Sequence, residues 1–317
     1  MKKKIGILIL FPLIISMYGC GASQDTSTTT TTSTTTTSTT SSTSTTTSST
    51  TTTTVDAKIF TVYFVDVGQG DAVLIKTNAG AGILIDSGPS DASNKLINFI
   101  DSLGISYLAG VFLTHPHEDH YGEMKDIIKK YPIGGFYFTN YPSPNSSYLE
   151  LMNELVSCHV NTKEVDNDNS GLINNVNWDI YCPTHEGFIN TSSDVNDNSM
   201  VIKFYNADKT DLLIGGDIEI SGISHLLSNM PTSNALDVEL LKINHHGSSN
   251  GTNQAFINAT TPKDAFICVG AGNSYGHPDP TTLNLLSTNG INVYRTDLKG
   301  NITVSVNGTS YSITTSK

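Results

Sequence analysis

The chain has 317 residues, of which 37% are apolar and 15% charged, and its formal net charge is −12. This acidic balance argues against a broad basic surface that would hold nucleic acid without sequence preference. It does not exclude a phosphate substrate, because bound metal ions invert the local electric field.

The first 20 residues have the pattern of a bacterial export signal. Lysines follow Met1, and a mostly apolar run covers residues 5–18, which is short for a transmembrane helix of about 20 apolar residues. The run ends in Met-Tyr-Gly-Cys, which resembles a lipobox. We therefore expect a signal peptide over residues 1–20 and a lipid on Cys20 that anchors an exported protein to the outer face of the cell membrane. The alternative is an ordinary cleaved signal and a secreted product.

Residues 21–54 are almost entirely Ser and Thr. Because a segment without apolar periodicity cannot bury a core, we interpret it as a disordered linker. Residues 55–317 are long enough for one large domain. In an oxidising compartment Cys158 and Cys182 could form a disulfide, whereas buried free thiols are the alternative for them and for Cys268.

In the first half of the domain, strand-like and helical patterns alternate. β-Branched and apolar runs predict strands at 59–65, 72–76, 82–85 and 108–113. Helical spacing of apolar residues predicts helices at 91–103, 118–130 and 145–156.

The second half repeats this mixture. Strands are predicted at 178–182, 199–205, 211–214, 238–243, 264–269, 293–295, 301–306 and 310–314. Helices are predicted at 218–228, 253–258 and 280–288. Strands outnumber helices and helices fall between them, which indicates two packed sheets with helices outside, an α/β (α+β) fold with αββα layers.

The most informative stretch is Thr-His-Pro-His-Glu-Asp-His-Tyr-Gly at residues 114–122, which follows a buried strand and opens a helix. His115, His117, Asp119 and His120 offer imidazole and carboxylate donors that suit zinc, manganese or iron. A strand-to-helix turn can direct the first two to one centre and the last two to another. The alternative, a polar helix cap with surface histidines, fits this order poorly.

His-x-His-x-Asp-His is the defining motif of the metallo-β-lactamase superfamily, which the chain resembles. Further motifs follow in order: VDVGQGDA at 65–72, ILIDSG at 83–88, GGDIE at 215–219, KINHHGS at 242–248 and YGHP at 275–278. Together they are similar to the extracellular hydrolase domain of ComEC-type competence proteins and its free-standing secreted relatives. The resemblance covers residues 58–315 and implies a four-layer αββα sandwich.

The resemblance implies two divalent metal ions, zinc or manganese, held by the loop residues together with Asp217 and His246. Asp217 would bridge the ions and offset their repulsion. His246 fits the pattern of the last ligand better than His245, which would support the site or touch substrate, although the choice between them stays open. Asp86 matches a residue that hydrogen-bonds the metal loop rather than the metal.

The chain departs from the superfamily at the third ligand of the first metal, where most members have a histidine. Here residues 196–200 read Asn-Asp-Asn-Ser-Met, so Asn198 and Ser199 are the candidate donors. Their oxygens are weaker ligands, so we expect a looser first site that favours manganese. His185 lies near in sequence but in an unmatched context, and His159 and His225 are expected at the surface.

The implied chemistry is hydrolysis by an activated water, which Asp119 and Asp217 orient. His277 would contact the anionic group or protonate the leaving oxygen, or serve a structural role. Ser248 and Lys242 could hold phosphate oxygens, but structural roles are expected for both.

We therefore expect a phosphodiesterase whose partner is a phosphate-containing substrate, DNA among the candidates. A phosphorylated wall polymer is the other candidate substrate, and no protein partner is indicated. The alternatives are a lactam, lactone or thioester hydrolase, against which the missing histidine counts, and a non-catalytic metal-binding module.

Overall fold

The computed structural model describes residues 59–92, 94–206 and 210–317. The expected signal peptide, the lipobox with Cys20 and the Ser/Thr-rich linker lie outside these residues. Among the helices of the described residues, none combines the length and the apolar character needed to cross a membrane.

Two mixed sheets form the centre of the domain. The order of the first is β15-β14-β1-β2-β3-β4-β5-β6, and the order of the second is β13-β12-β11-β10-β9-β8-β7. The strands of the first sheet are β1 (Ile59–Phe64), β2 (Val73–Lys76), β3 (Gly82–Ile85), β4 (Leu108–Leu113), β5 (Phe136–Phe138), β6 (Thr162–Glu164), β14 (Ile302–Asn307) and β15 (Ser310–Thr315). Those of the second are β7 (Ser170–Ile173), β8 (Val176–Cys182), β9 (Val201–Tyr205), β10 (Asp211–Ile214), β11 (Leu240–Lys242), β12 (Asp264–Ile267) and β13 (Asn292–Arg295).

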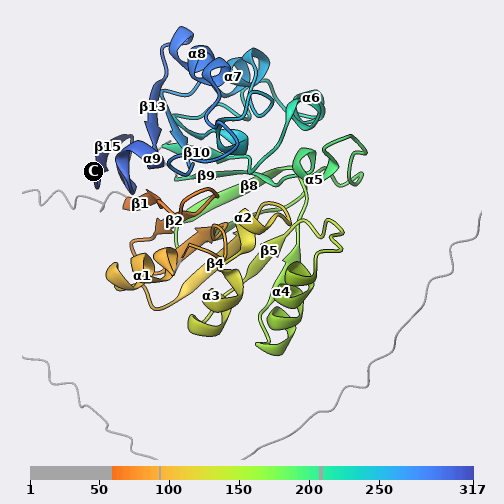
Figure 1. Ribbon diagram of the computed structural model, residues 1–317, viewed down its shortest axis with the longest axis vertical. Coiled ribbons are helices and arrows are strands. Elements are labelled where there is room, and N and C mark those ends of the chain that lie inside the picture. Colours follow the sequence, from red (N-terminus) through yellow and green to blue (C-terminus); the bar gives the residue numbers. More distant parts are fainter. Residues whose placement is uncertain (1–58, 93, 207–209) are drawn as a thin grey trace, which may run out of the picture. The chain divides into compact units, whose positions relative to one another are not determined.

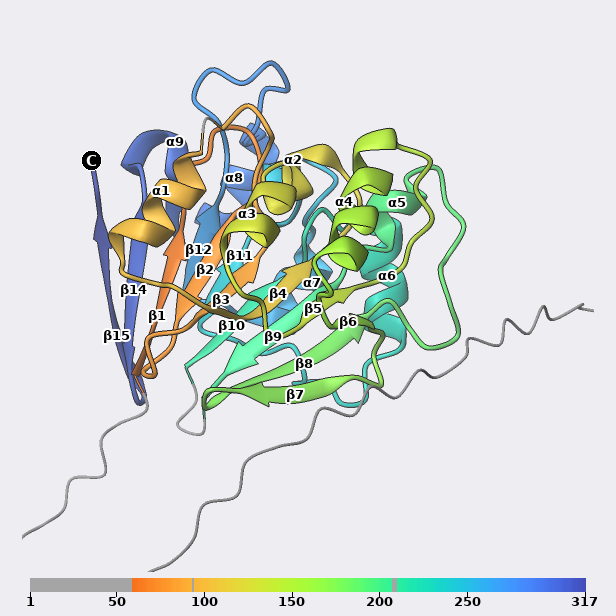
Figure 2. The ribbon, with the colours of Figure 1, turned by 90° about the horizontal axis from the view of Figure 1, so that it is seen from below.

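Helices cover the outer face of each sheet, as Figures 1 and 2 show. The first sheet is covered by α1 (Lys95–Ser102), α3 (Met124–Lys130) and α4 (Ser146–Ser157). The second is covered by α6 (Ile220–Ser228), α7 (Gln254–Thr260) and α8 (Pro280–Thr288). Short elements complete the chain: α2 (Glu118–Tyr121), α5 (Asp194–Asp197), η1 (Asn244–Gly247) and α9 (Thr296–Lys299). The predicted αββα sandwich is confirmed.

The main core lies between the two sheets. Along β1, Phe60, Val62 and Phe64 are buried in it while Tyr63 packs against the outer helices, which is the two-residue period of a strand with both faces covered. Phe64 stacks on Phe266 of the opposite sheet, with ring centroids 4.1 Å apart. Such aromatic contacts hold the two sheets face to face.

The topology brings polar residues to one edge of the sandwich. β3 and β4 are parallel neighbours, and so are β10 and β11, so within each sheet the carboxyl ends of these strands meet. Asp86 follows β3, and Asp217 comes shortly after β10. The Met200 N–H donates to the Thr114 carbonyl at 2.8 Å. This bond ties the chain just after β4 to the chain just before β9, so the two edges face each other.

The helix predicted at 118–130 is divided into α2 and α3, so the prediction of one continuous helix was wrong. The carbonyl of His120 accepts from Ser87 N at 2.6 Å instead of from the next helical turn, and Glu123 N donates to Ser87 Oγ at 3.2 Å. A Cβ on Gly122 would lie 2.1 Å from Ser90 N. Close packing against residues 87–90 therefore interrupts the helix where the metal-loop residues end.

Several short elements were missed by the sequence analysis. β5 and β6 have three residues each, too few for a periodic pattern. β7 pairs with β8 through a hairpin at Asn174 and Asn175, whose φ values are +47° and +69°. Two residues with positive φ are typical of a type I′ turn, so the Asn-Asn pair was a usable signal.

The three described cysteines are free, so a disulfide between Cys158 and Cys182 is not formed. Cys158 is exposed, while Cys182 and Cys268 are buried. Burial raises the pKa of the Cys182 thiol to about 12, and it does the same for Cys268. Since the thiolate is the reactive form, the two buried thiols are inert in the folded protein.

In a Cys20→Ser background, we expect dithionitrobenzoate to modify one thiol of the folded chain rapidly and two more only after unfolding. Cys158→Ser should remove the rapid phase, because Cys158 alone of the described thiols is exposed. The release of thionitrobenzoate at 412 nm measures this. Two rapid thiols in the folded protein would contradict the burial of Cys182 and Cys268.

Candidate metal centre

Asp86 organises the loop that follows β4. Its Oδ1 accepts from Thr114 N at 2.9 Å, and its Oδ2 accepts from Thr114 Oγ1 at 2.8 Å. His120 Nδ1 lies 2.8 Å from the same Oδ2. A carboxylate behind one ring nitrogen fixes the orientation of the ring and leaves the other nitrogen for a ligand. The loop is thus joined at both ends to one buried aspartate, the contact that the resemblance implied.

The two leading histidines of the loop present their rings to each other. His115 Nε2 lies 3.0 Å from His117 Nδ1, and Thr114 Oγ1 lies 3.1 Å from His115 Nδ1. His115 is buried, whereas His117, at the N-terminus of α2, is partly exposed. One nitrogen of each ring therefore faces the same small space.

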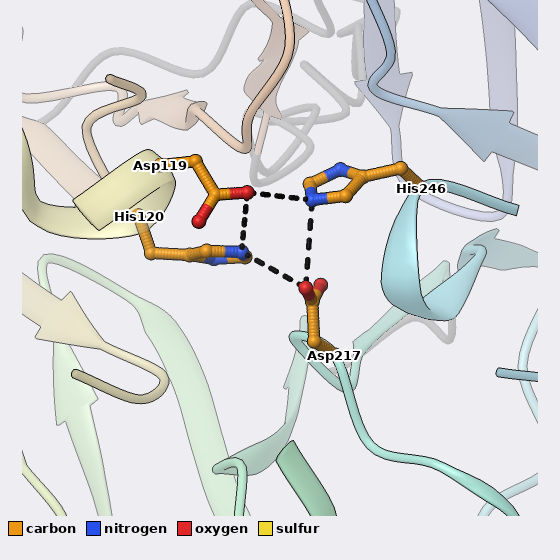
Figure 3. A group of neighbouring side chains, drawn as sticks. All are labelled: Asp119, His120, Asp217 and His246. Atoms are coloured by element: carbon orange, nitrogen blue, oxygen red, sulfur yellow. Dashed lines mark hydrogen bonds and ion pairs between the residues drawn. The ribbon is translucent and has the colours of Figure 1, made fainter. Parts of the chain in front are cut away.

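A second group consists of Asp119, His120, Asp217 and His246 (Figure 3). Asp119 and His120 come from α2, Asp217 from the turn after β10 and His246 from η1. Asp119 Oδ2 lies 3.1 Å from His246 Nε2, and Asp217 Oδ2 lies 3.3 Å from His120 Nε2 and 3.5 Å from His246 Nε2. The side chains of both sheets thus meet at one point.

These distances fit a metal ion. Donor atoms of a four-coordinate ion with bonds of about 2.0–2.1 Å lie about 3.3–3.4 Å apart. A further distance within the quartet, between His120 Nε2 and Asp119 Oδ2, is 3.8 Å. His120 Nε2 and Asp217 Oδ1 are buried and have no hydrogen-bond partner among the described residues. Unpaired buried donors at these separations are what a metal site requires.

Both adjacent histidines of η1 aim at Asp217. His246 Nε2 lies 3.5 Å from Asp217 Oδ2, and His245 Nε2 lies 3.8 Å from it. Neighbouring side chains of a strand point to opposite faces, but here both residues are left-handed, with φ of 49° at His245 and 51° at His246. Each such residue costs of the order of 1–3 kcal/mol and is typical of functional sites.

Sequence reasoning assigned no role to Asp71, which lies beneath the quartet. Its Oδ1 is 3.1 Å from His246 Nδ1, a nitrogen that also lies 3.0 Å from the Cys268 carbonyl. Its Oδ2 forms a short ion pair with Lys242 Nζ, and both side chains are buried. Lys242 is therefore structural and is not available to hold phosphate. In the sequence, the signal for Asp71 was its place in the VDVGQGDA motif beside Gly70. The structure shows why Gly70 is needed there, because a Cβ added to it would lie 2.4 Å from the Asp119 carbonyl oxygen.

Within the quartet, the pKa values of the carboxylates and the imidazoles shift in opposite directions. Burial alone would raise the pKa of Asp217, but His246 and His120 outweigh it and hold the pKa well below its usual value. Burial alone would lower the pKa of His120, but Asp217 and then Asp86 raise it well above 6.5. Burial alone would lower the pKa of His246 too, but Asp217 and then Asp71 raise this pKa well above 6.5. A cation would replace these protons, so metal binding should release them.

The pKa values of His115 and His117 shift in the opposite direction, below 6.5. Burial and then the charge of His120 lower the pKa of His115 well below 6.5. Burial is also the main cause of the lowered pKa of His117, and His120 and His245 add to it. Both rings are therefore neutral near pH 7, which is the form that binds metals.

The balance of buried charge calls for cations. Four carboxylates gather here: those of Asp71, Asp86 and Asp217 are buried and that of Asp119 is partly exposed. Lys242 neutralises one of these charges, and without a metal the remaining charge is offset, among the described residues, only by protons on His120 and His246. Buried carboxylates without counter-charges are costly. Divalent ions at the donor groups would offset that charge.

Some expected site residues lie elsewhere. Asn198 binds the 189–194 segment, with Nδ2 to the carbonyls of Ile189 and Asp194 at 2.8 and 2.5 Å and Oδ1 to Ile189 N at 2.8 Å. Ser248 Oγ donates to Asn250 Oδ1 at 2.6 Å. These groups bond to local structure, which agrees with the structural role expected for Ser248, while a supporting role of Asn198 at the centre stays a prediction.

Other expected residues lie at or near the centre. Ser199 Oγ accepts from Asp217 N at 3.2 Å and so positions the chain of that aspartate. The ring of His277 lies 5.6 Å from that of His245, half-buried, and its Nδ1 has no hydrogen-bond partner among the described residues. His159 and His185 are exposed, and His225 is partly exposed with Nε2 3.4 Å from Thr184 Oγ1.

Comparison with known proteins agrees with this geometry. Residues 65–144 match the model of the metallo-beta-lactamase superfamily. The chain is 27% identical over 262 residues to ComE operon protein 3 of Bacillus subtilis, covering 76% of this chain and 32% of that protein. It is 28% identical over 236 residues to competence protein ComA of Neisseria gonorrhoeae, covering 74% of this chain and 30% of that protein. The chain thus spans about a third of the length of these relatives.

Solved structures show the same fold. The metallo-β-lactamase fold protein YhfI of Bacillus subtilis has a TM-score of 0.51 and 11% identity, covering 78% of this chain and all of that chain (100%). A variant of the β-hydroxylase CmlA has a TM-score of 0.50 and 15% identity, covering 78% of this chain and 54% of that chain. Because a β-hydroxylase shares it, the fold alone does not define the reaction.

Residues 65–144 therefore match the metallo-β-lactamase superfamily, and the described domain has the metallo-β-lactamase fold. The fold together with the donor groups supports divalent metal ions and a metal-dependent hydrolase. The domain is similar to about a third of each of the two relatives, and in this sense it is ComEC-like.

Proposed function

We propose that the domain is a two-metal phosphodiesterase that acts on nucleic acid or on a phosphorylated polymer at the cell surface. One ion would be held by His115 and His117, the other by Asp119, His120 and His246, with Asp217 between them. Zinc and manganese both suit such donors. Two bound divalent ions would lower the pKa of a water and stabilise charge that develops on a phosphoryl oxygen.

The observation that carries this proposal is a groove that runs from Asp119. It has a volume of about 700 Å³, and its lining includes an exposed tyrosine, an amide and one lysine together with three carboxylates; these are Tyr275, Gln69, Lys95, Asp91, Glu118 and Asp119. Tyr275 is 71% exposed and stacks on His277 with ring centroids 5.7 Å apart. An open aromatic face beside a metal site can stack a nucleobase whatever its sequence.

The residues of the chain would divide the work around a phosphodiester. Asp119 has a side chain 33% exposed, so it faces both the quartet and the groove and can orient the attacking water. Burial, then His245 and His246, lower the pKa of His277 below 6.5, so this ring is neutral at pH 7. A neutral imidazole donates one N–H, which suits contact with an anionic phosphate oxygen.

The groove also limits how the substrate is held. It includes the acidic Glu118 as well as Lys95, and the chain has a net charge of −12. Long-range attraction to a polyanion is therefore weak. Binding would rest on stacking and on the metal ions, so we expect its dependence on salt to be shallow.

The proposed location is the outer face of the cell membrane, with a lipid on Cys20 and a linker between the anchor and the domain. It rests on the sequence of residues 1–54 alone. A substrate outside the cell agrees with this location.

The test is hydrolysis by the full chain, supplied with manganese or zinc, of bis-p-nitrophenyl phosphate, an oligonucleotide and nitrocefin. We expect the phosphodiesters to be cleaved and nitrocefin to be left intact, and His117→Ala to abolish turnover. Cleavage of nitrocefin alone would refute the phosphodiesterase and favour the lactamase alternative. Metal uptake without any turnover would favour a binding module.

Tyr275→Ala separates the two phosphodiester substrates. Loss of a base stack costs about 1–3 kcal/mol, so KM for the oligonucleotide should rise about 10-fold, and KM for bis-p-nitrophenyl phosphate, which has no nucleobase, should change less. Tyr107→Ala is the matched control, since Tyr107 is 41% exposed and lies outside the groove. An unchanged KM for the oligonucleotide would direct the search to a polymer without bases.

A further inference from the structure

The first metal position lacks one of the protein ligands that the superfamily pattern supplies, because residues 196–200 contain no histidine. His115 Nε2 and His117 Nδ1 lie 3.0 Å apart, and Asp217 Oδ2 lies 4.0 Å from the former. These atoms can surround one ion, with one further place for a protein donor. The residues expected to fill it do not, because the amide of Asn198 binds the 189–194 segment and Ser199 Oγ accepts from a main-chain N–H.

His245 lies where that donor is needed. Its Nε2 is 3.8 Å from Asp217 Oδ2, and the centroid of its ring is 6.2 Å from that of His246. Atoms bound to one four-coordinate ion lie about 3.3–3.4 Å apart. His245 Nε2 and His115 Nε2 lie 3.8 and 4.0 Å from the same Asp217 Oδ2, and His117 Nδ1 lies 3.0 Å from His115 Nε2, so the three rings would have to move toward one another to enclose an ion.

On the other side of the His245 ring, Nδ1 faces a carboxylate that could hold the ring in the orientation for binding a metal ion. Glu219 Oε1 lies 3.3 Å from His245 Nδ1, a buried nitrogen that has no hydrogen bond among the described residues. Asn196 Nδ2 donates to the same Oε1 at 2.9 Å and holds the carboxylate in place. A hydrogen bond from Nδ1 to Glu219 would leave Nε2 on the side of Asp217. Carboxylates placed in this way orient metal-binding histidines and raise their basicity.

We propose that His245 is the third protein ligand of the first metal ion, that Glu219 positions it, and that the adjacent His245 and His246 bind different ions. The inference rests on the two-metal centre proposed above. The left-handed backbone at both residues is then explained, because it directs two neighbouring rings to the two sides of Asp217. The histidine missing from residues 196–200 is replaced from a different strand end.

The experiment measures metal content rather than activity. The full chain and its variants are dialysed against buffered zinc with a competing chelator, and bound zinc is measured by mass spectrometry. We expect the wild type to hold two ions and His245→Ala to hold one, with affinity at the first site reduced at least 100-fold. Glu219→Gln should weaken the same site about 10- to 100-fold, as loss of an orienting partner does.

His277→Ala is the matched control, because His277 neighbours His245 but supplies no ligand, and it should retain two ions. The single ion retained by His245→Ala shows that the variant is folded. With cobalt in place of zinc, loss of an imidazole ligand should change the visible spectrum of His245→Ala but leave that of His277→Ala as in the wild type.

Two results would overturn the inference: two ions bound with wild-type affinity in His245→Ala, or a single ion in the wild type. The first would assign His245 to substrate contact. Failure of the proposed function looks different, since the wild type would then bind two ions and His245→Ala one while neither cleaves a phosphodiester.

Discussion

Asp217→Asn is expected to lower kcat/KM for bis-p-nitrophenyl phosphate by about 10³-fold. Asp217 Oδ2 lies within 3.3–4.0 Å of imidazole nitrogens of both groups, those of His120 and His115. An amide keeps the size of the side chain but removes the charge that offsets the repulsion of two cations. Charge stabilisation of this kind contributes several kcal/mol, and about 4 kcal/mol corresponds to a 10³-fold change in rate.

Asp211→Asn is the matched control, because Asp211 begins the strand β10 that Asp217 follows. It pairs with Lys203 at 2.7 Å, away from the metal donors, and its removal should leave kcat/KM within about twofold of the wild type. Bound metal and circular dichroism are measured for both variants. If Asp217→Asn kept wild-type kinetics with two bound ions, Asp217 would not bridge the centre.

Asp71→Ala is expected to lower the free energy of unfolding of the metal-free protein by about 3–5 kcal/mol. Its carboxylate pairs with Lys242 Nζ, and both side chains are almost fully inaccessible to solvent. Removing one partner leaves a buried ammonium that donates to the Gly216 carbonyl at 3.3 Å. Urea unfolding in the presence of a chelator measures the change without the contribution of metal binding.

The double variant Asp71→Ala, Lys242→Met should recover much of that loss, since an apolar replacement of a buried pair is often neutral. If the double variant were as unstable as Asp71→Ala, the cost would come from the contact with His246 rather than from the unpaired lysine.

The pH dependence follows from the same pair. Burial alone would raise the pKa of Asp71, but Lys242 and then His246 bring it below its ordinary 3.8. Burial alone would lower the pKa of Lys242, and Asp71 raises it above 10.5. A group with a lowered folded pKa stabilises the protein above its unfolded pKa and loses that effect as pH falls. The part of the difference between wild type and Asp71→Ala that comes from the Asp71–Lys242 pair should therefore shrink below about pH 4. The part that acts through His246, whose pKa Asp71 raises above 6.5, should be full below about pH 6.5 and decline as pH rises through the raised pKa.

Local patterns predicted most of the architecture. A run of β-branched and aromatic residues identified β1, and a short apolar run followed by His-x-His-x-Asp-His placed the loop at the end of β4. These signals are local because side-chain periodicity depends on neighbouring residues only. Elements of three or four residues, such as β5 and α5, have too few positions to show a period and were missed.

The contacts of the site were harder to predict than its residue types. Asn198 and His245 were both polar candidates with open roles, and the structure turns the first toward residues 189–194 and the second toward Asp217. Which way a side chain points depends on backbone dihedrals that the residue type does not determine, here the left-handed pair in η1.

By itself, the sequence determined the sandwich of two sheets and the types of donor that could bind metals, because both follow from the spacing of apolar, His and Asp residues that lie near one another in the chain. Only the tertiary structure decided that Asp71 lies against Lys242, that the long helix breaks at Gly122 and that two adjacent rings share Asp217. Each of these depends on segments far apart in the chain, and their approach is set by the packing of one sheet against the other.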